Sequence, residues 1–171
     1  MSKLLILGAG GYGKTVADLA AQLGQYDAVH FLDDGQTGPH ILGKCCEFAA
    51  YMDGHTHVYP AFGNNTVRMQ WIERLRSQNV CVPTLVHPRA YVSPTAALED
   101  GVTVLPMAVV NTGVTVETGC IINIGALIDH DSVIGQGCHL APGAIVKAEN
   151  RVPPGTKVES GTVVENRQYP L

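Results

Sequence analysis

A six-residue repeat in the C-terminal half is the strongest constraint on how this chain can fold. From Val92, stepping by six, thirteen consecutive positions up to Val164 hold Val, Ile or Leu. Eight of the twelve positions three residues further on are Gly, and the next position mostly holds a compact side chain. Neither a helical period nor simple strand alternation produces this pattern. A solenoid in which each hexapeptide forms one short strand and one turn does produce it.

Three hexapeptides close one triangular coil of 18 residues, so the repeat predicts about four stacked coils. The aliphatic side chains then point inward, the compact side chains sit near the corners, and glycine supplies turn conformations that strain other residues. Each strand pairs with the coils above and below it, so only the two ends expose strand edges. Cys120 and Cys138 are one coil apart and are expected to pack in the core. We therefore expect an all-β parallel β-helix over residues 86–171.

Residues 1–85 predict a small Rossmann-like α/β domain. A buried strand over residues 3–7 leads into Gly8-Ala9-Gly10-Gly11-Tyr12-Gly13, and a helix over residues 14–23 follows. The pattern G-x-G-x-x-G between a strand and a helix favours phosphate binding at the helix N-terminus. In the alternative interpretation, the glycines serve only close packing of strand and helix. About 85 residues are too few for both halves of a full dinucleotide-binding fold, which disfavours NAD.

Two further strand ends in this domain carry polar side chains. A strand over residues 28–32 ends at Asp33 and Asp34, and Asp33 lies where a carboxylate can meet a ribose hydroxyl. A third strand near residues 57–62 ends at Gly63-Asn64-Asn65. A helix over about residues 66–77 follows, with Asn65 or Thr66 as the expected N-cap.

Composition narrows the class of protein. Only 15% of the residues are charged against 46% hydrophobic, which favours a buried oligomer interface. A net charge of −4 offers no electrostatic footprint for nucleic acid or an anionic membrane. The first apolar run, residues 4–7, is too short for a signal peptide or a membrane span, so a cytoplasmic location is expected. Five cysteines without a C-x2-C pair predict reduced thiols and no metal site.

Together the two halves resemble the PglD/NeuD-type sugar acetyltransferases of the hexapeptide-repeat superfamily. The resemblance spans nearly the whole chain and implies a left-handed β-helix, which general chirality rules alone would not give. It implies an acetyl-CoA-dependent N-acetyltransferase acting on a UDP-linked 4-amino-4,6-dideoxy sugar, assembled as a homotrimer with acetyl-CoA between protomers. Its markers in this chain are Gly8 to Lys14, Phe31-Leu32-Asp33-Asp34, Gly63-Asn64-Asn65, His87-Pro88, and residues 123–144 with Ile128-Asp129-His130-Asp131.

The resemblance also implies residue roles. His130 is expected to be the general base and Asp131 its orienting acid, although family members often carry the longer Glu there. The residues implied in binding acetyl-CoA are His139, Gly143 and Ala148. Those implied in binding the substrate are Gly10, Gly11, Tyr12, Gly13, Asp33, Asp34, Gly63, Asn64, Asn65 and Asn123.

The register of the repeat makes a separate prediction about the oligomer. His130 and His139 are nine residues apart, which is half a coil, so they should lie on opposite sides of the triangular prism. Asn123 and His139 are sixteen residues apart, nearly a full coil, and should lie near the same corner. A site that uses all three must combine His130 from one subunit with Asn123 and His139 from its neighbour. A triangular prism packs naturally as a cyclic trimer.

Three other functions remain open from the sequence. One is O-acetylation of sialic acid or a related sugar. Another is a β-helix metal enzyme similar to γ-type carbonic anhydrases, although such a site needs three histidines and the repeat holds only His130 and His139. The third is a non-catalytic nucleotide-binding protein with a structural β-helix.

Overall fold

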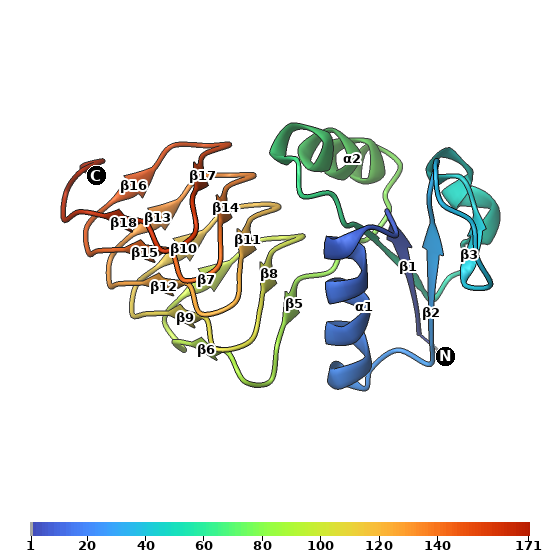
Figure 1. Ribbon diagram of the computed structural model, residues 1–171, viewed down its shortest axis with the longest axis horizontal. Coiled ribbons are helices and arrows are strands. Elements are labelled where there is room, and N and C mark those ends of the chain that lie inside the picture. Colours follow the sequence, from blue (N-terminus) through green and yellow to red (C-terminus); the bar gives the residue numbers. More distant parts are fainter. Residues whose placement is uncertain (1) are drawn as a thin grey trace. The chain divides into compact units, whose positions relative to one another are not determined.

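The computed structural model describes residues 2–171 and divides into two compact units, Met1–Pro83 and Thr84–Leu171. Figure 1 shows both units. The division lies two residues before the boundary that we expected after residue 85, because Leu85 is already in the first strand of the β-helix.

The first unit is a four-stranded parallel sheet with helices packed on it. The strand order is β3-β2-β1-β4, with β1 (Lys3–Leu7) paired to β2 (Ala28–Leu32) on one side and β4 (Thr56–Pro60) on the other. Helix α1 (Gly11–Leu23) packs on β1 and β2, and α2 (Asn65–Ser77) packs on β4. The short strand β3 (Ile41–Gly43) and the 3-10 helix η1 (Cys45–Tyr51) complete it.

Three details of this unit differ from the sequence-based expectation. Strand β3 and helix η1 were not foreseen. Helix α1 begins at Gly11 rather than Lys14, because the glycine-rich loop itself enters the helix after Gly10 as N-cap. Helix α2 is capped by Asn64, whose side chain accepts the Val67 N–H at 3.0 Å, rather than by Asn65 or Thr66.

The second unit is a left-handed β-helix built from fourteen two-residue strands. Every coil passes through three parallel sheets, here called faces 1, 2 and 3. Face 1 holds β5 (Leu85–Val86), β8 (Thr103–Val104), β11 (Ile121–Ile122), β14 (His139–Leu140) and β17 (Lys157–Val158); face 2 holds β6 (Tyr91–Val92), β9 (Val109–Val110), β12 (Leu127–Ile128), β15 (Ile145–Val146) and β18 (Val163–Val164); face 3 holds β7 (Ala97–Leu98), β10 (Thr115–Val116), β13 (Val133–Ile134) and β16 (Arg151–Val152).

The pairing register confirms the eighteen-residue coil, since Val116 pairs with Ile134 and Ile122 with Leu140. The second residue of each strand points inward, and these side chains together with Cys120 and Cys138 form one continuous core. The β-helix starts one hexapeptide earlier than the repeat that we counted from Val92, at β5.

From residue 101 onward, every corner of the prism contains one residue in the left-handed backbone region. From position 101 to position 167, in steps of six, all twelve have a positive φ. Eight of them are the glycines that the repeat predicted, because glycine adopts this conformation without a steric penalty. The four exceptions are Met107, Asp131, Glu149 and Arg167.

Candidate active site

His130 and Asp131 form a hydrogen-bonded pair on the corner between faces 2 and 3. His130 Nδ1 donates to Asp131 Oδ2 at 2.8 Å, so the shorter Asp reaches the imidazole without the extra methylene of Glu. With the proton held on Nδ1, the lone pair of His130 lies on Nε2 and can accept a proton from a substrate. The side chains are 49% and 62% exposed, so the pair is accessible on the surface of the protomer.

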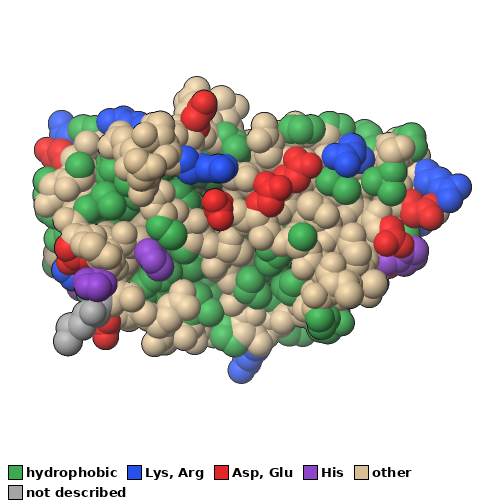
Figure 2. Space-filling model, turned by 180° about the vertical axis from the view of Figure 1, so that it is seen from behind, with side chains coloured by type: hydrophobic (Ala, Val, Ile, Leu, Met, Phe, Trp, Pro, Cys, Tyr) green, Lys and Arg blue, Asp and Glu red, His purple; other side chains and the backbone are tan. Residues whose placement is uncertain are grey.

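The surroundings of His130 favour its protonated form. The hydrogen bond to Asp131 raises the pKa of His130 above its ordinary value. Desolvation opposes this shift, and the negative charges of Asp129, Asp131 and Glu149 raise the pKa further. Figure 2 shows charged side chains of both signs gathered at the end of the β-helix where the chain finishes. The imidazole therefore has the character of a base that holds a proton firmly once it has taken one.

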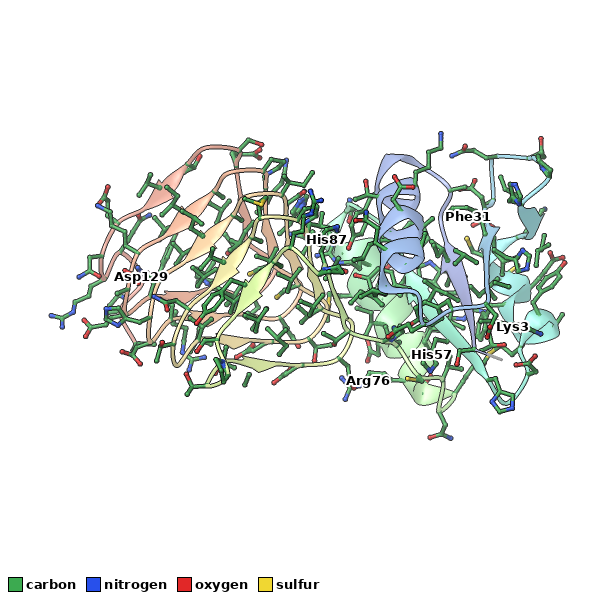
Figure 3. All side chains as sticks on the ribbon, turned by 90° about the horizontal axis from the view of Figure 1, so that it is seen from below. Lys3, Phe31, His57, Arg76, His87 and Asp129 are labelled. Atoms are coloured by element: carbon green, nitrogen blue, oxygen red, sulfur yellow. The ribbon has the colours of Figure 1, made fainter. Side chains whose placement is uncertain are left out.

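Asp129 fixes the backbone of His130 (Figure 3 labels Asp129). Its Oδ1 accepts the His130 N–H at 2.8 Å and the Asn111 Nδ2–H at 3.1 Å. The backbone N–H of His130 is the main reason why the pKa of Asp129 lies below its ordinary value. Sequence analysis gave Asp129 and Asn111 no role. Their separation of eighteen residues, one coil, was the signal that could have linked them.

The remaining β-helix residues fall into two groups. Asn123 Nδ2 donates to His139 Nε2 at 3.0 Å, as the sixteen-residue spacing predicted. Gly143 lies in the same column of corners as Gly125, between faces 1 and 2. His139 is on face 1, which is opposite the corner of His130. Ala148 stacks one coil beyond His130, so within one protomer it is separated from His139 and Gly143.

The glycines of the N-terminal loop have different structural roles. A Cβ on Gly13 would lie 2.0 Å from the Gly8 carbonyl oxygen, so Gly13 permits the close approach of α1 to the end of β1. A Cβ on Gly10, Gly11 or Gly63 would meet nothing within 4 Å. Gly13 therefore matches the packing interpretation, whereas Gly10 and Gly11 leave the mouth of the loop open.

Three of the four polar residues at the strand ends accept hydrogen bonds from backbone N–H groups. Asp33 Oδ2 accepts the Ala9 N–H at 2.7 Å, and its Oδ1 accepts backbone N–H groups of the following turn. Partial desolvation raises the pKa of Asp33, but these three donors together hold it below its ordinary value. Asp34 accepts the Cys45 N–H at 2.9 Å, and Asn64 caps α2.

Asn65 and Tyr12 are held by side chains. Asn65 Oδ1 accepts from Nη2 of Arg68 at 2.9 Å, and Arg68, which is fully buried, also donates to the Phe62 carbonyl. The hydroxyl groups of Tyr12 and Tyr59 are hydrogen-bonded at 2.9 Å. Sequence analysis missed Arg68, because a lone arginine in a helix gives no sign that it is buried.

Two further observations bear on the other functions. In residues 2–171, no group of three or more His, Cys, Asp or Glu side chains could hold a metal ion. No helix within the same range is long and apolar enough to cross a membrane.

The β-helix and its α/β unit define a hexapeptide-repeat acyltransferase, and comparisons with known proteins specify the family. The PglD N-terminal domain family matches residues 3–75. The acetyltransferase domain of PglB from Neisseria gonorrhoeae, solved with acetyl coenzyme A, is 34% identical with a TM-score of 0.91, over 94% of this chain and 80% of that one. The chain therefore belongs to the sugar acetyltransferases of the hexapeptide-repeat superfamily.

Two other solved structures extend the comparison. A His-to-Asn variant of perosamine N-acetyltransferase from Caulobacter crescentus, in complex with CoA and GDP-perosamine, is 26% identical with a TM-score of 0.81, over 96% of this chain and 89% of that one. WeeI from Acinetobacter baumannii is 22% identical with a TM-score of 0.85, over 100% of this chain and 85% of that one, and shows the shared fold.

Proposed function

We propose that this chain transfers the acetyl group of acetyl-CoA to the amine of a UDP-linked 4-amino-4,6-dideoxy sugar, with His130 as the general base. The observation that carries the proposal is the His130–Asp131 pair, which keeps Nε2 available as a proton acceptor. The match to a PglB domain solved with acetyl coenzyme A supports the donor. Because acetyl-CoA and nucleotide sugars are both made in the cytoplasm, we place the reaction there.

The nucleophile is the neutral amine, and His130 accepts the proton that the amine nitrogen loses when the amide forms. The amine nitrogen attacks the thioester carbonyl carbon while His130 Nε2 removes a proton from that nitrogen. The tetrahedral intermediate then collapses, the C–S bond breaks, and the proton on His130 is available to the leaving CoA sulfur. Asp131 holds the imidazole in the reactive tautomer and stabilises the imidazolium that forms. General-base assistance of this kind contributes about 10²–10⁴-fold in rate.

The UDP portion is proposed for the N-terminal unit, at the open loop of Gly10 and Gly11 beside the end of β2. A helix N-terminus with accessible backbone N–H groups suits a diphosphate. The perosamine N-acetyltransferase was solved with a GDP-sugar, so the base is a specific point to test. Binding of one amino sugar linked to UDP or to GDP separates the two, and free sialic acid, which has no UDP, tests the O-acetylation alternative.

We further propose that three copies assemble through face 2. The five outward residues of this face are all apolar, and Tyr91, Leu127 and Val163 are 53%, 39% and 37% exposed. The outward residues of face 3, in contrast, include Thr115 and Arg151. A continuous row of apolar side chains on the outside of a protomer is typical of an interface. The complete row consists of Tyr91, Val109, Leu127, Ile145 and Val163.

Assembly through face 2 would complete the active site. If face 2 of each copy points toward a threefold axis, the corner at one edge of face 2 lies against the corner at the other edge of face 2 in the neighbouring copy. One flanking corner carries His130, and the other carries Asn123 and Gly143. His130 of one protomer would then lie beside Asn123 and His139 of the next, with acetyl-CoA in the groove between them. Ala148, one coil beyond His130, would form part of the same groove.

Replacing His130 with Ala tests the proposal. We expect turnover, measured as CoA thiol release with a UDP-4-amino sugar, to fall by about 10²-fold or more. Folding should change little, because the side chain is half exposed. His55→Ala, at an exposed position in the first unit, is the matched control and should keep full activity. Unchanged thiol release in the His130 variant would refute the role of this residue as the base.

A further inference from the structure

Gly113 lies one coil before Asp131 in the same column of corners. It adopts the left-handed conformation with φ 69°, and Asp131 follows with φ 54°. The Gly113 N–H donates to Thr95 Oγ1 at 3.1 Å, and Thr95 is in turn bonded to the Ser93 hydroxyl at 3.0 Å. The turn beneath Asp131 is thus fixed by side chains of the coil below it.

The space over Gly113 is occupied by the Asp131 carboxylate. A Cβ built on Gly113 would lie 2.5 Å from Asp131 Oδ1, but 3.6 Å from its Cγ and 3.8 Å from its Cα. The backbone of Asp131 therefore has room and only its carboxylate oxygen does not. Three other corner glycines with a positive φ lack such a neighbour, since a Cβ on Gly125, Gly155 or Gly161 would meet nothing within 4 Å.

We propose that Gly113 is a positioning residue of the active site, whose missing side chain leaves the place that the Asp131 carboxylate needs in order to orient His130. The proposal rests on the proposed function of His130. Both carboxylate oxygens belong to one rigid planar group, so moving Oδ1 away from a methyl group at position 113 also rotates Oδ2 away from His130 Nδ1. Because rotating the carboxylate costs less than moving the backbone, a side chain at Gly113 disturbs the pair before it disturbs the coil.

The experiment compares Gly113→Ala with Gly155→Ala. Gly155 has φ 72°, so both variants place a methyl group on a left-handed residue and should lower Tm to a similar extent. Only Gly113→Ala should lower kcat, by about tenfold, because part of the general-base assistance is lost. In an NMR titration, the pKa of His130 should fall toward its ordinary value in the Gly113 variant and stay unchanged in the Gly155 variant.

A double variant separates positioning from a general effect on the fold. Once Asp131 is replaced by Ala, adding Gly113→Ala should change neither kcat nor the pKa of His130 further. If Gly113→Ala folds poorly, Gly113→Asn repeats the comparison, since Asn tolerates the left-handed region better. An unchanged pKa of His130 in the Gly113 variants, or additive effects in the double variant, would overturn the proposal. The titration needs no turnover, so it decides about Gly113 even if His130→Ala retains activity and the proposed base fails.

Discussion

Replacing Asn150 with Ala should destabilise the last coils of the β-helix. Asn150 is fully buried near the end of the solenoid. It occupies the repeat position that mostly holds a compact side chain in the other hexapeptides. Its Oδ1 accepts the Tyr169 N–H at 2.8 Å, and its Nδ2 donates to the carbonyl groups of Lys147 and Glu165 at 2.8 and 2.9 Å. The side chain therefore ties residues 165–169 across the open end, where a β-helix must protect its strand edges.

The magnitude follows from these three bonds. Each buried hydrogen bond contributes about 1 kcal/mol net, so their loss should lower the free energy of unfolding by about 3 kcal/mol. The Lys147 carbonyl keeps the Ser132 hydroxyl as a donor at 3.2 Å, and the Glu165 carbonyl keeps the Gln168 N–H at 3.0 Å. The Tyr169 N–H loses the acceptor that Asn150 provides, so this amide should show the largest local effect.

Two probes can follow the change. Trp71 is the only tryptophan and lies in the first unit, so its fluorescence reports that unit, whereas the β-sheet circular dichroism signal reports mainly the β-helix. Urea titrations at one fixed protomer concentration give the free energy of unfolding, and hydrogen exchange gives the protection of the Tyr169 amide.

Thr156→Ala is the control, since Thr156 holds the equivalent repeat position and its hydroxyl donates to the Pro153 carbonyl at 2.6 Å. The control should lose about 1 kcal/mol or less. A loss below about 1 kcal/mol in the Asn150 variant, with unchanged protection of the Tyr169 amide, would refute this account of the end of the solenoid.

Two further predictions concern the active site and the assembly. Because the Asp131 carboxylate raises the pKa of His130, kcat/KM should rise with pH through an apparent pKa above the ordinary 6.5. Asp131→Ala should move this rise to lower pH. A rise at an unchanged pH would contradict the pairing of Asp131 with His130. Leu127→Glu on face 2 should yield monomers with little activity by light scattering and CoA-release assays, whereas Val133→Glu on face 3 should leave a trimer; a trimeric Leu127 variant would exclude face 2 as the interface.

The sequence determines the β-helix almost completely because its signal is repeated. An inward aliphatic residue every six positions and a glycine at most corners leave no other fold with the same register. The expected start of the β-helix at residue 86 lies within one residue of β5, although the repeat itself was counted only from Val92. Strand β3 and helix η1 were missed for the opposite reason, since neither short, unrepeated segment offers a periodicity long enough to detect.

Parts of the candidate site were accessible from spacing and parts were not. The contact between Asn123 and His139 follows from the eighteen-residue coil, and so does their separation from His130. The hydrogen bonds that Asp33 accepts from the glycine-rich loop and from the turn that follows it could not be foreseen. They depend on backbone N–H groups whose directions no side-chain pattern reveals. The space that Gly113 leaves for Asp131 was hidden for a similar reason, since its glycine matched the repeat and needed no further explanation.

The corners that lack glycine show where the sequence departs from the hexapeptide repeat. The column between faces 3 and 1 is glycine throughout, at Gly101, Gly119, Gly137 and Gly155. In the column between faces 2 and 3, Gly113 is followed instead by Asp131, Glu149 and Arg167. Each of these left-handed residues costs about 1–2 kcal/mol relative to glycine. The ion pair between Glu149 and Arg167 is exposed, so it offsets little of this free-energy cost. Stability alone would therefore favour glycine at position 131, and the aspartate there is better explained by its bond to His130 than by the coil that it strains.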